Sequence, residues 1–260
     1  MLGVAVAACN FQLPFGGGVD ASTGDTAADM PADSSDAADA PPGAFCAPDA
    51  QLVLCLSFDQ APLPAVLANE GNAAVSAKLT NVQQIASPDG NAALVDATST
   101  IALPASADVT GVLSSEVWFR IDTDAANGAR SGIYDSNISS QNISMFYNRS
   151  DPTHQLTCGL GNQATSFTVT VAIGAFSYAA CTCAGTTVSL YLDGTLVAEA
   201  TGDCATGGAF LGDGLTIGSN NTGVGQPVND NLIGAIDGVR LWSRVLSASE
   251  IAARHLRAAR

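Results

Sequence analysis

Residues 235–256 read AIDGVRLWSRVLSASEIAARHL, a stretch that begins with a strand pattern and ends with a helix pattern. The segment SASE (247–250) fits the capping box Ser-x-x-Glu, in which two side chains satisfy free N–H groups at a helix start. We predict a helix of roughly ten residues after it, with Ile251 and Leu256 on one side. The sequence therefore ends in a strand followed by one short helix.

The chain upstream of this stretch is dominated by strand patterns. In LVLCLSFD (52–59), leucine and phenylalanine alternate with Cys, Ser and Asp, which predicts a half-buried strand with Leu52 on its apolar face. In TTVSLYLDGTLVAEA (186–200), Asp193-Gly194 is a favoured type I′ turn pair and predicts a hairpin. Further strands are predicted at 114–122, 131–136, 142–149, 166–173, 215–218 and 235–244. Many short strands separated by turns, in a chain with 26 Gly and 11 Pro, indicate an all-β sandwich or jelly roll.

Several of these segments resemble one known family. LTIGSNNTG (215–223) followed by NLIGAIDGVRLWSRVLSASEI (231–251) resembles the close of a laminin-G-like, concanavalin A-like jelly-roll domain. LCLSFDQ (54–60), EVWFRI (116–121) and CTCAGTTVSLYLDGTLVA (181–198) resemble its first strand, an early aromatic strand and its central hairpin. The resemblance covers residues 46–260. It implies a two-sheet antiparallel sandwich with one concave sheet, adjacent first and last strands, and a short C-terminal helix.

The sequence of 260 residues is acidic, with 24 Asp and Glu residues against 9 Lys and Arg and a net charge of −15. Asp supplies 20 of these acids and Glu only four. Such a surface repels the phosphate backbone, which argues against nucleic acid as a partner.

The first residues carry a possible membrane anchor. Val6-Ala7-Ala8-Cys9 resembles the lipobox of bacterial lipoproteins, which implies that 1–9 is a signal remnant and Cys9 the lipidated residue. Eight residues and no basic n-region precede Cys9, so either the true start lies upstream or the segment is not a signal.

Residues 10–45 are rich in Gly, Ala, Ser, Thr, Pro and Asp, with six Asp and no basic residue. This composition predicts a disordered acidic tether, because the segment has few large apolar residues whose burial could offset the entropy lost on ordering. A tether behind a lipid anchor implies attachment at the bacterial cell envelope, in the outer membrane or at the cell surface.

With Cys9 set aside for lipidation, six cysteines remain, at positions 46, 55, 158, 181, 183 and 204. An even number fits disulfides in an oxidising compartment. We favour the pairs Cys46–Cys55, Cys158–Cys181 and Cys183–Cys204. The alternative that joins Cys158 to Cys183 and Cys181 to Cys204 stays open, because Cys181 and Cys183 share one strand face. A zinc site is the disfavoured interpretation, since the C-x-C spacing is too tight for a usual zinc knuckle.

Enzymatic motifs are missing from the sequence. Some glucanases share the jelly-roll fold, yet their Glu-x-Asp-x-x-Glu pattern is absent and no two of the four Glu residues share a predicted strand. Nor does the chain contain G-x-S-x-G, HExxH or a P-loop. We therefore predict a non-enzymatic binding module.

The predicted ligand is a carbohydrate or another extracellular molecule. Trp118, Tyr134, Phe146 and Tyr147 are the candidate ligand-binding residues, because saccharides bind aromatic platforms beside polar groups. The alternative is a structural or adhesion module that binds protein partners without a glycan.

A structural Ca²⁺ is implied by the resemblance, because related folds hold one between the first-strand region and the last strand. Asp237 occupies the matching position in the last strand, and Asp59 ends the first strand. Ca²⁺ takes six to eight oxygen ligands, so backbone carbonyls and water would complete such a site.

Overall fold

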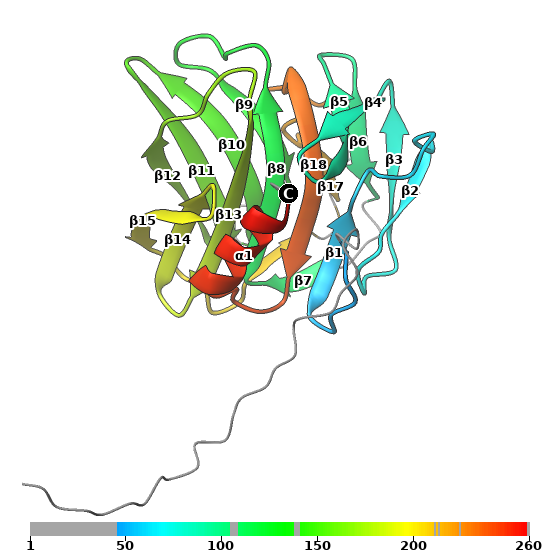
Figure 1. Ribbon diagram of the computed structural model, residues 1–260. Helices are drawn as coiled ribbons and strands as arrows, with labels where there is room; N and C mark the ends of the chain where they lie inside the picture. The colour runs from blue at the N-terminus through cyan, green and yellow to red at the C-terminus, as the bar shows by residue number, and fades with distance from the viewer. Residues whose placement is uncertain are drawn as a thin grey trace, which may run out of the picture. The chain divides into compact units, whose positions relative to one another are not determined.

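The computed structural model describes residues 46–258, except 105–108, 138–140, 211, 213 and 224 (Figure 1). These residues form two antiparallel eight-stranded sheets, a two-stranded pair and one helix, α1 (Ala248–Ala258). The predicted all-β jelly roll with a short C-terminal helix is therefore confirmed.

The first sheet contains the strand that opens the domain and the strand that closes it. Its order is β15 (Thr195–Thr201), β14 (Thr187–Leu192), β13 (Phe176–Ala184), β8 (Ser114–Ile121), β18 (Gly234–Trp242), β5 (Gly90–Val95) and β4 (Gln83–Ser87). β1 (Leu52–Leu56) also pairs with β18. The adjacency of first and last strands that the resemblance implies is thus present.

The second sheet has the order β12 (Gln163–Val169), β11 (Thr153–Gly161), β10 (Asn142–Ser150), β9 (Arg130–Asp135), β17 (Leu215–Ile217), β6 (Thr100–Leu103), β3 (Ser76–Thr80) and β2 (Val66–Ala68). The small pair is β16 (Gly208–Phe210) with β7 (Val109–Val112).

The main core lies between the inner faces of the two sheets. Along β8, every second residue points inward, so Val117, Phe119 and Ile121 are fully buried. Strand β10 contributes Met145 and Tyr147 from the opposite sheet in the same way. Period-2 alternation therefore fixes which residues of each strand remain available on the outer face.

A second, smaller core lies on the outer face of the first sheet, beneath α1. Trp118, Tyr178 and Trp242 pack there with Ile251, which comes from the helix. In Figure 1 the helix lies across the β13–β14 side of this sheet. The helix therefore covers an aromatic surface that the sheet alone would leave exposed to water.

The predicted capping box is present at the start of α1. The backbone N–H of Ser247 donates to Glu250 Oε2 at 2.8 Å, and the backbone N–H of Glu250 donates to Ser247 Oγ at 3.2 Å. These two bonds satisfy donors that a helix start leaves free.

Two apolar side chains depart from the sequence predictions. Leu52 belongs to the core beneath the helix, because the pairing of β1 with β18 shifts register between Leu52 and Leu54 and turns Leu52 to the other face. Leu256 is 58% exposed, so Ile251 alone of the two predicted positions anchors the helix to the sheet.

The structure joins Cys46 to Cys55, Cys158 to Cys181 and Cys183 to Cys204, the pairing that we favoured. The second of these bonds links β11 to β13 and so connects the two sheets across the core.

The proposed lipid anchor at Cys9, the signal remnant 1–9 and the tether 10–45 lie outside the described residues. Among the residues that are described, no helix has both the length and the apolar character to cross a membrane.

Candidate functional site

A pocket of about 260 Å³ lies on the outer face of the second sheet. Its lining comes from β9 to β12 and from two loops: Arg130, Asp135, Asn137, Asn142, Ser144, Phe146, Thr157, Ala164 and Asn220. Most of these side chains carry hydrogen-bonding groups, and Phe146 supplies the aromatic surface.

Strand register builds the floor of this pocket from small residues. Ser144 on β10 is paired with Gly159 on β11, and Gly159 is paired with Ala164 on β12. Paired residues point to the same face of a sheet, so the three form one row across three strands. A Cβ on Gly159 would collide with Ser144 Oγ and with the Asn142 side chain, so these two side chains lie over the glycine.

The neighbouring rows form the two sides of the pocket. Asn142 and Phe146 lie two residues before and after Ser144 on β10 and therefore point to the same outer face. Phe146 is paired with Thr157 on β11, and Thr157 Oγ1 lies 2.7 Å from Ser166 Oγ on β12. The floor is thus a shallow trough with an amide on one side and an aromatic ring on the other.

A loop closes the pocket on the β9 side. A Cβ on Gly132 of β9 would collide with the backbone of Ser219 and Asn220, so this loop backbone lies directly on the strand. Asn220 is held there by a bond from its backbone N–H to the carbonyl of Asn229 at 2.8 Å. Asp135, at the end of β9, lies at this closed side and is almost fully buried.

Two polar atoms in the trough lack partners among the described residues. Ser144 Oγ and Asn142 Oδ1 are buried and make no hydrogen bond there. An unpaired buried polar group costs about 1–3 kcal/mol. The hydrogen-bonding capacity of these two atoms is therefore unused among the described residues, and both atoms are shielded from solvent.

The charged groups at and beside the pocket are Arg130, Asp135 and Asp230. The Arg130 guanidinium lies 4.2 Å from the Phe146 ring centroid, and its Nε is 2.6 Å from Asp230 Oδ2. Burial raises the pKa of Asp135, opposed by backbone hydrogen bonds from Asn137 and Asn221 and by the charge of Arg130. One cation therefore faces two carboxyl groups.

The structure brings only Phe146, of the four predicted ligand-binding aromatics, to this pocket. Trp118 is 4% exposed beneath α1, on the first sheet. Tyr134 and Tyr147 point into the main core, where their hydroxyls donate to Ser115 Oγ at 2.8 Å and to Asp124 Oδ1 at 2.7 Å. These three predictions are corrected, because packing and internal hydrogen bonds occupy the side chains.

Sequence reasoning missed Asn142 and Ser144 but contained the signal that finds them. In NISMFYNR (142–149), Ile, Met and Tyr occupy alternate positions, so Asn142, Ser144 and Phe146 must share the opposite face. The same alternation separates Phe146 from Tyr147.

The two predicted calcium ligands lie near one another at a gap in the first sheet. β18 pairs with β5 before Asp237 and with β1 after Gly238, whose positive φ of 59° accommodates the irregularity. Asp237 is fully buried there; its Oδ2 accepts from Ser87 Oγ at 2.6 Å, and its Oδ1 has no partner among the described residues.

The electrostatics of this gap are unfavourable for a lone carboxylate. Burial raises the pKa of Asp237 to about 8, with further contributions from Asp59 and Asp89. In the part of the chain that the structure describes, no three acidic, His or Cys side chains are arranged to hold a metal ion. The residues present thus supply an incomplete ligand set, and calcium stays a prediction.

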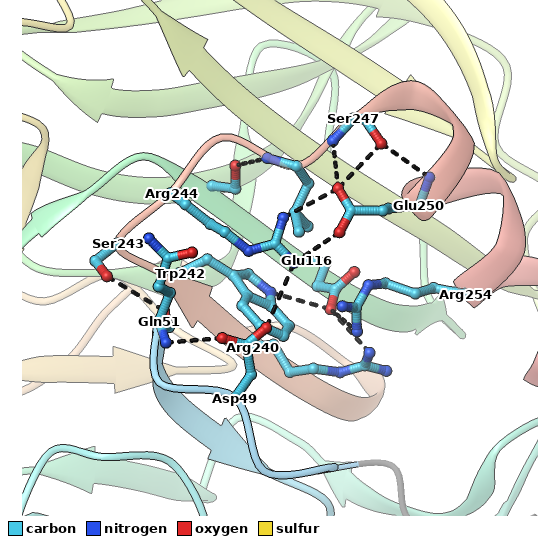
Figure 2. A network of polar contacts seen from close by, with 12 residues as sticks. Asp49, Gln51, Glu116, Arg240, Trp242, Ser243, Arg244, Ser247, Glu250 and Arg254 are labelled. Carbon is cyan, nitrogen blue, oxygen red and sulfur yellow. Dashed lines mark hydrogen bonds and ion pairs between the residues drawn. The ribbon is translucent and has the colours of Figure 1, made fainter. Parts of the chain in front are cut away.

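A third polar cluster lies beneath α1 and is shown in Figure 2. The carboxylate of Glu116 is fully buried and lies 2.8 Å from Arg240 Nη1 and 3.6 Å from Arg254 Nη1. It also accepts from Trp242 Nε1 at 3.2 Å and from the Tyr178 hydroxyl. These internal partners occupy the carboxylate, so the cluster fastens the helix to the sheet and is not an open site.

A family model of the concanavalin A-like lectin/glucanase superfamily matches residues 95–252, more than half of the chain. The chain belongs to this superfamily. Its matched region includes the whole lining of the pocket and the last strand of the first sheet. Among curated proteins, a comparison finds no match to the sequence.

Solved structures of concanavalin A-like fold resemble the chain at low sequence identity. Domain 4 of an extracellular arabinanase from Geobacillus stearothermophilus, in complex with arabinotriose, has a TM-score of 0.57 at 16% identity, covering 79% of this chain and 98% of that one. A structure of botulinum neurotoxin type C, whose cell entry depends on two ganglioside molecules, has a TM-score of 0.55 at 14% identity, covering 80% and 51%. Trypanosoma rangeli sialidase has a TM-score of 0.54 at 15% identity, and the match covers 80% of this chain and 33% of the sialidase chain. At these identities the likeness shows the fold alone.

Proposed function

We propose that this protein is a non-enzymatic carbohydrate-binding module and that it binds sugar in the pocket on the outer face of the second sheet. The observation that carries the proposal is the pair of unpartnered polar atoms, Ser144 Oγ and Asn142 Oδ1, beside the ring of Phe146. A sugar presents hydroxyl groups around its edge and C–H groups on its faces. Because both atoms are shielded from solvent, the Ser144 and Asn142 side chains would turn towards the sugar to bond its hydroxyls, while a C–H face contacts the ring.

The charge of the pocket favours a neutral sugar. Arg130 is already paired with Asp230, so an incoming carboxylate would meet the carboxyl group of Asp135 without an uncommitted cation to balance it. The domain as a whole is also acidic, with eighteen acids against nine bases in residues 46–260. Like charges at close range disfavour acidic sugars.

The absence of catalysis is part of the proposal. Glycoside hydrolysis by the usual route uses two carboxyl groups on either side of the scissile bond. Among the lining residues that the structure describes, Asp135 is the one carboxylate, and its Oδ2 accepts a hydrogen bond from the backbone N–H of Asn221 at 3.0 Å. This lining suits holding a sugar and lacks the second group that cleavage needs.

Neighbouring structures add modest support for this choice of ligand. The arabinanase domain is solved with arabinotriose and the neurotoxin is described with gangliosides, so folds of this kind bind glycans in other proteins. We further propose that a lipid anchor at Cys9 and the tether 10–45 hold the module at the bacterial cell envelope, where extracellular glycans or surface proteins are its partners.

The first test is a glycan and polysaccharide array probed with the oxidised protein. We expect saturable binding of one class of neutral sugars. The variant Ser144→Ala should lose at least tenfold in affinity while its stability stays equal or rises, because the deleted hydroxyl has no partner among the described residues.

The control for this test is Thr168→Ala, which removes an exposed hydroxyl from the edge strand β12 outside the pocket lining. It should bind as the parent protein does. A blank array from folded protein would contradict the proposal and favour the alternative, a structural or adhesion module with protein partners.

A further inference from the structure

We infer that the pocket binds a glycan by the end of its chain, with the remainder of the chain leaving across the edge strand β12. This inference rests on the proposed function and adds how the sugar chain is oriented. It follows from the shape of the trough, which is closed on one side and open on the other.

The direction of the trough is set by the row Ser144, Gly159 and Ala164. These residues lie on three successive strands, so the row runs perpendicular to the strands for about 10 Å, two interstrand spacings. No side chain in this row is larger than that of serine. Gly159 is covered by the Ser144 and Asn142 side chains, so the part of the row that is open to a sugar chain lies at Ala164 on β12.

The β9 side of the trough is blocked. The row continues in register from Ser144 to Asp135 and then to Thr216 of β17. Both of these side chains are buried, and Asp135 Oδ2 is bonded to the backbone of Asn221 in the covering loop. Asn220, from the same loop, stands beside them as a wall of the pocket. A polymer therefore has no exit over β9 and β17.

The β12 side has no comparable barrier among the described residues. Ala164 is exposed and carries only a methyl group, and β12 is the last strand of its sheet. The volume of about 260 Å³ lies just below the range of roughly 300–1,000 Å³ that holds drug-sized ligands, which suits a terminal unit. The rest of the glycan would then lie outside the protein beyond Ala164.

Chain-end binding makes a quantitative prediction about polysaccharides. We would immobilise arabinan, xylan, mannan, mixed-linkage β-glucan and amylose, each intact and after partial acid hydrolysis to several mean chain lengths, at equal mass of sugar. For every polysaccharide that binds, the amount of protein bound per gram should rise in proportion to the number of chain ends. Capacity that stays constant or falls as the chains shorten would overturn the inference.

A blocking substitution tests the proposed exit. Ala164→Trp places a large side chain on the open end of the row and should lower affinity at least tenfold for any chain that extends over β12. Thr168→Trp is the matched control, because it adds the same side chain to an exposed position of the same strand outside the pocket lining. Thermal unfolding would verify that both variants fold.

The outcomes separate this inference from the proposed function. If Ser144→Ala abolishes binding but capacity does not follow chain ends, or if Ala164→Trp binds as the parent protein does, then the sugar site stands and chain-end recognition is wrong. If none of the five polysaccharides binds folded protein and the wider array is blank, the proposed function itself fails.

Discussion

Glu116 illustrates at the scale of one residue how this fold tolerates a buried charge. Its carboxylate is enclosed between β8, β18 and α1, where Arg240 and Arg254 balance it and Trp242 donates a hydrogen bond (Figure 2). Removing one partner of such a group leaves the others desolvated and unpaired, which is more costly than the loss of an exposed ion pair.

Glu116→Ala should therefore lower the free energy of unfolding by about 3–5 kcal/mol. Denaturant unfolding monitored by tryptophan fluorescence is a suitable measurement. Glu199→Ala, at an exposed position on β15, is the matched control and should change stability by about 0.5 kcal/mol or less. Equal effects of the two substitutions would contradict the role assigned to Glu116.

Asp237 is expected to make stability depend on pH in the opposite sense to a carboxylate whose pKa is lowered in the fold. Its pKa of about 8 lies above the ordinary value of 3.8, so folding favours the protonated form. This contribution is complete below pH 4 and is lost as pH rises through 8. In chelator, the parent protein should lose stability over this range, and Asp237→Asn should lose less.

Calcium is expected to reverse that loss if it binds between Asp59 and Asp237. Adding Ca²⁺ at pH 7.5 should raise the thermal midpoint of the parent protein and leave Asp237→Asn unchanged, because ligand binding to the folded state stabilises it. Identical midpoints with calcium and with chelator would contradict the calcium prediction.

At this scale the sequence indicated which residues of a strand face the main core and which face outward. It did not indicate which outward-facing residues are buried by another element. The alternation in 114–122 places Trp118 on the outer face correctly, yet only the three-dimensional structure shows that α1 covers that face. Phe146 is itself only 5% exposed, and the Arg130 guanidinium lies over its ring. The helix that covers Trp118 comes from far along the chain, so the local pattern around Trp118 does not reveal it.

At the scale of elements, α1 depends on a few interactions at its first turn. Arg244 Nη2 lies 2.7 Å from Glu250 Oε1, and Glu250 also completes the capping box with Ser247. The hydrogen bond from Arg244 is the main cause that lowers the pKa of Glu250 to about 2. The helix is therefore fastened by a carboxylate that stays charged in mild acid.

Glu250→Gln should accordingly remove a pH-dependent part of the stability. A lowered pKa means that the stabilisation is present above the ordinary value of 4.5 and disappears as pH falls towards 2. The difference in unfolding free energy between the parent protein and Glu250→Gln should thus be constant near neutrality and shrink below pH 4.5. A difference that persists unchanged at pH 2.5 would disprove the assignment.

Features that a short motif specifies were predicted correctly, whereas features that depend on pairing with another strand were not. The Asp193-Gly194 hairpin is present, with φ values of 49° and 76° at the two turn residues. By contrast, Leu52 was assigned to the wrong face, because a register irregularity between paired strands is invisible in one strand. The residue pattern within a strand therefore indicates which residues alternate between the two faces. It does not indicate the bulges that arise from pairing with a neighbouring strand.

At the scale of the whole molecule, the disulfides constrain the unfolded chain. Cys183–Cys204 spans 21 residues and Cys46–Cys55 spans 9. Replacing Cys183 and Cys204 with alanines should lower the free energy of unfolding by about 3 kcal/mol. Replacing Cys46 and Cys55 should lower it less, because a longer loop loses more entropy on closure. Unfolding of the two double variants in denaturant would reveal the order, and the reverse order would contradict this account.

The global fold was predictable because its closing motif is specific, whereas the ligand-binding trough was not. The segment 231–251 identifies the jelly roll, but the floor of the trough depends on register between β10, β11 and β12 and on a loop from beyond residue 217. None of these relations is encoded within a single stretch of sequence.

The place of β18 in the first sheet has a consequence for biosynthesis. This strand lies between β8 and the pair β1 and β5, although it is the last strand in the sequence. During translation β18 is synthesised after all the other described strands. Until then the first sheet remains divided into two halves. The two halves of this sheet can therefore join only after β18 has been synthesised.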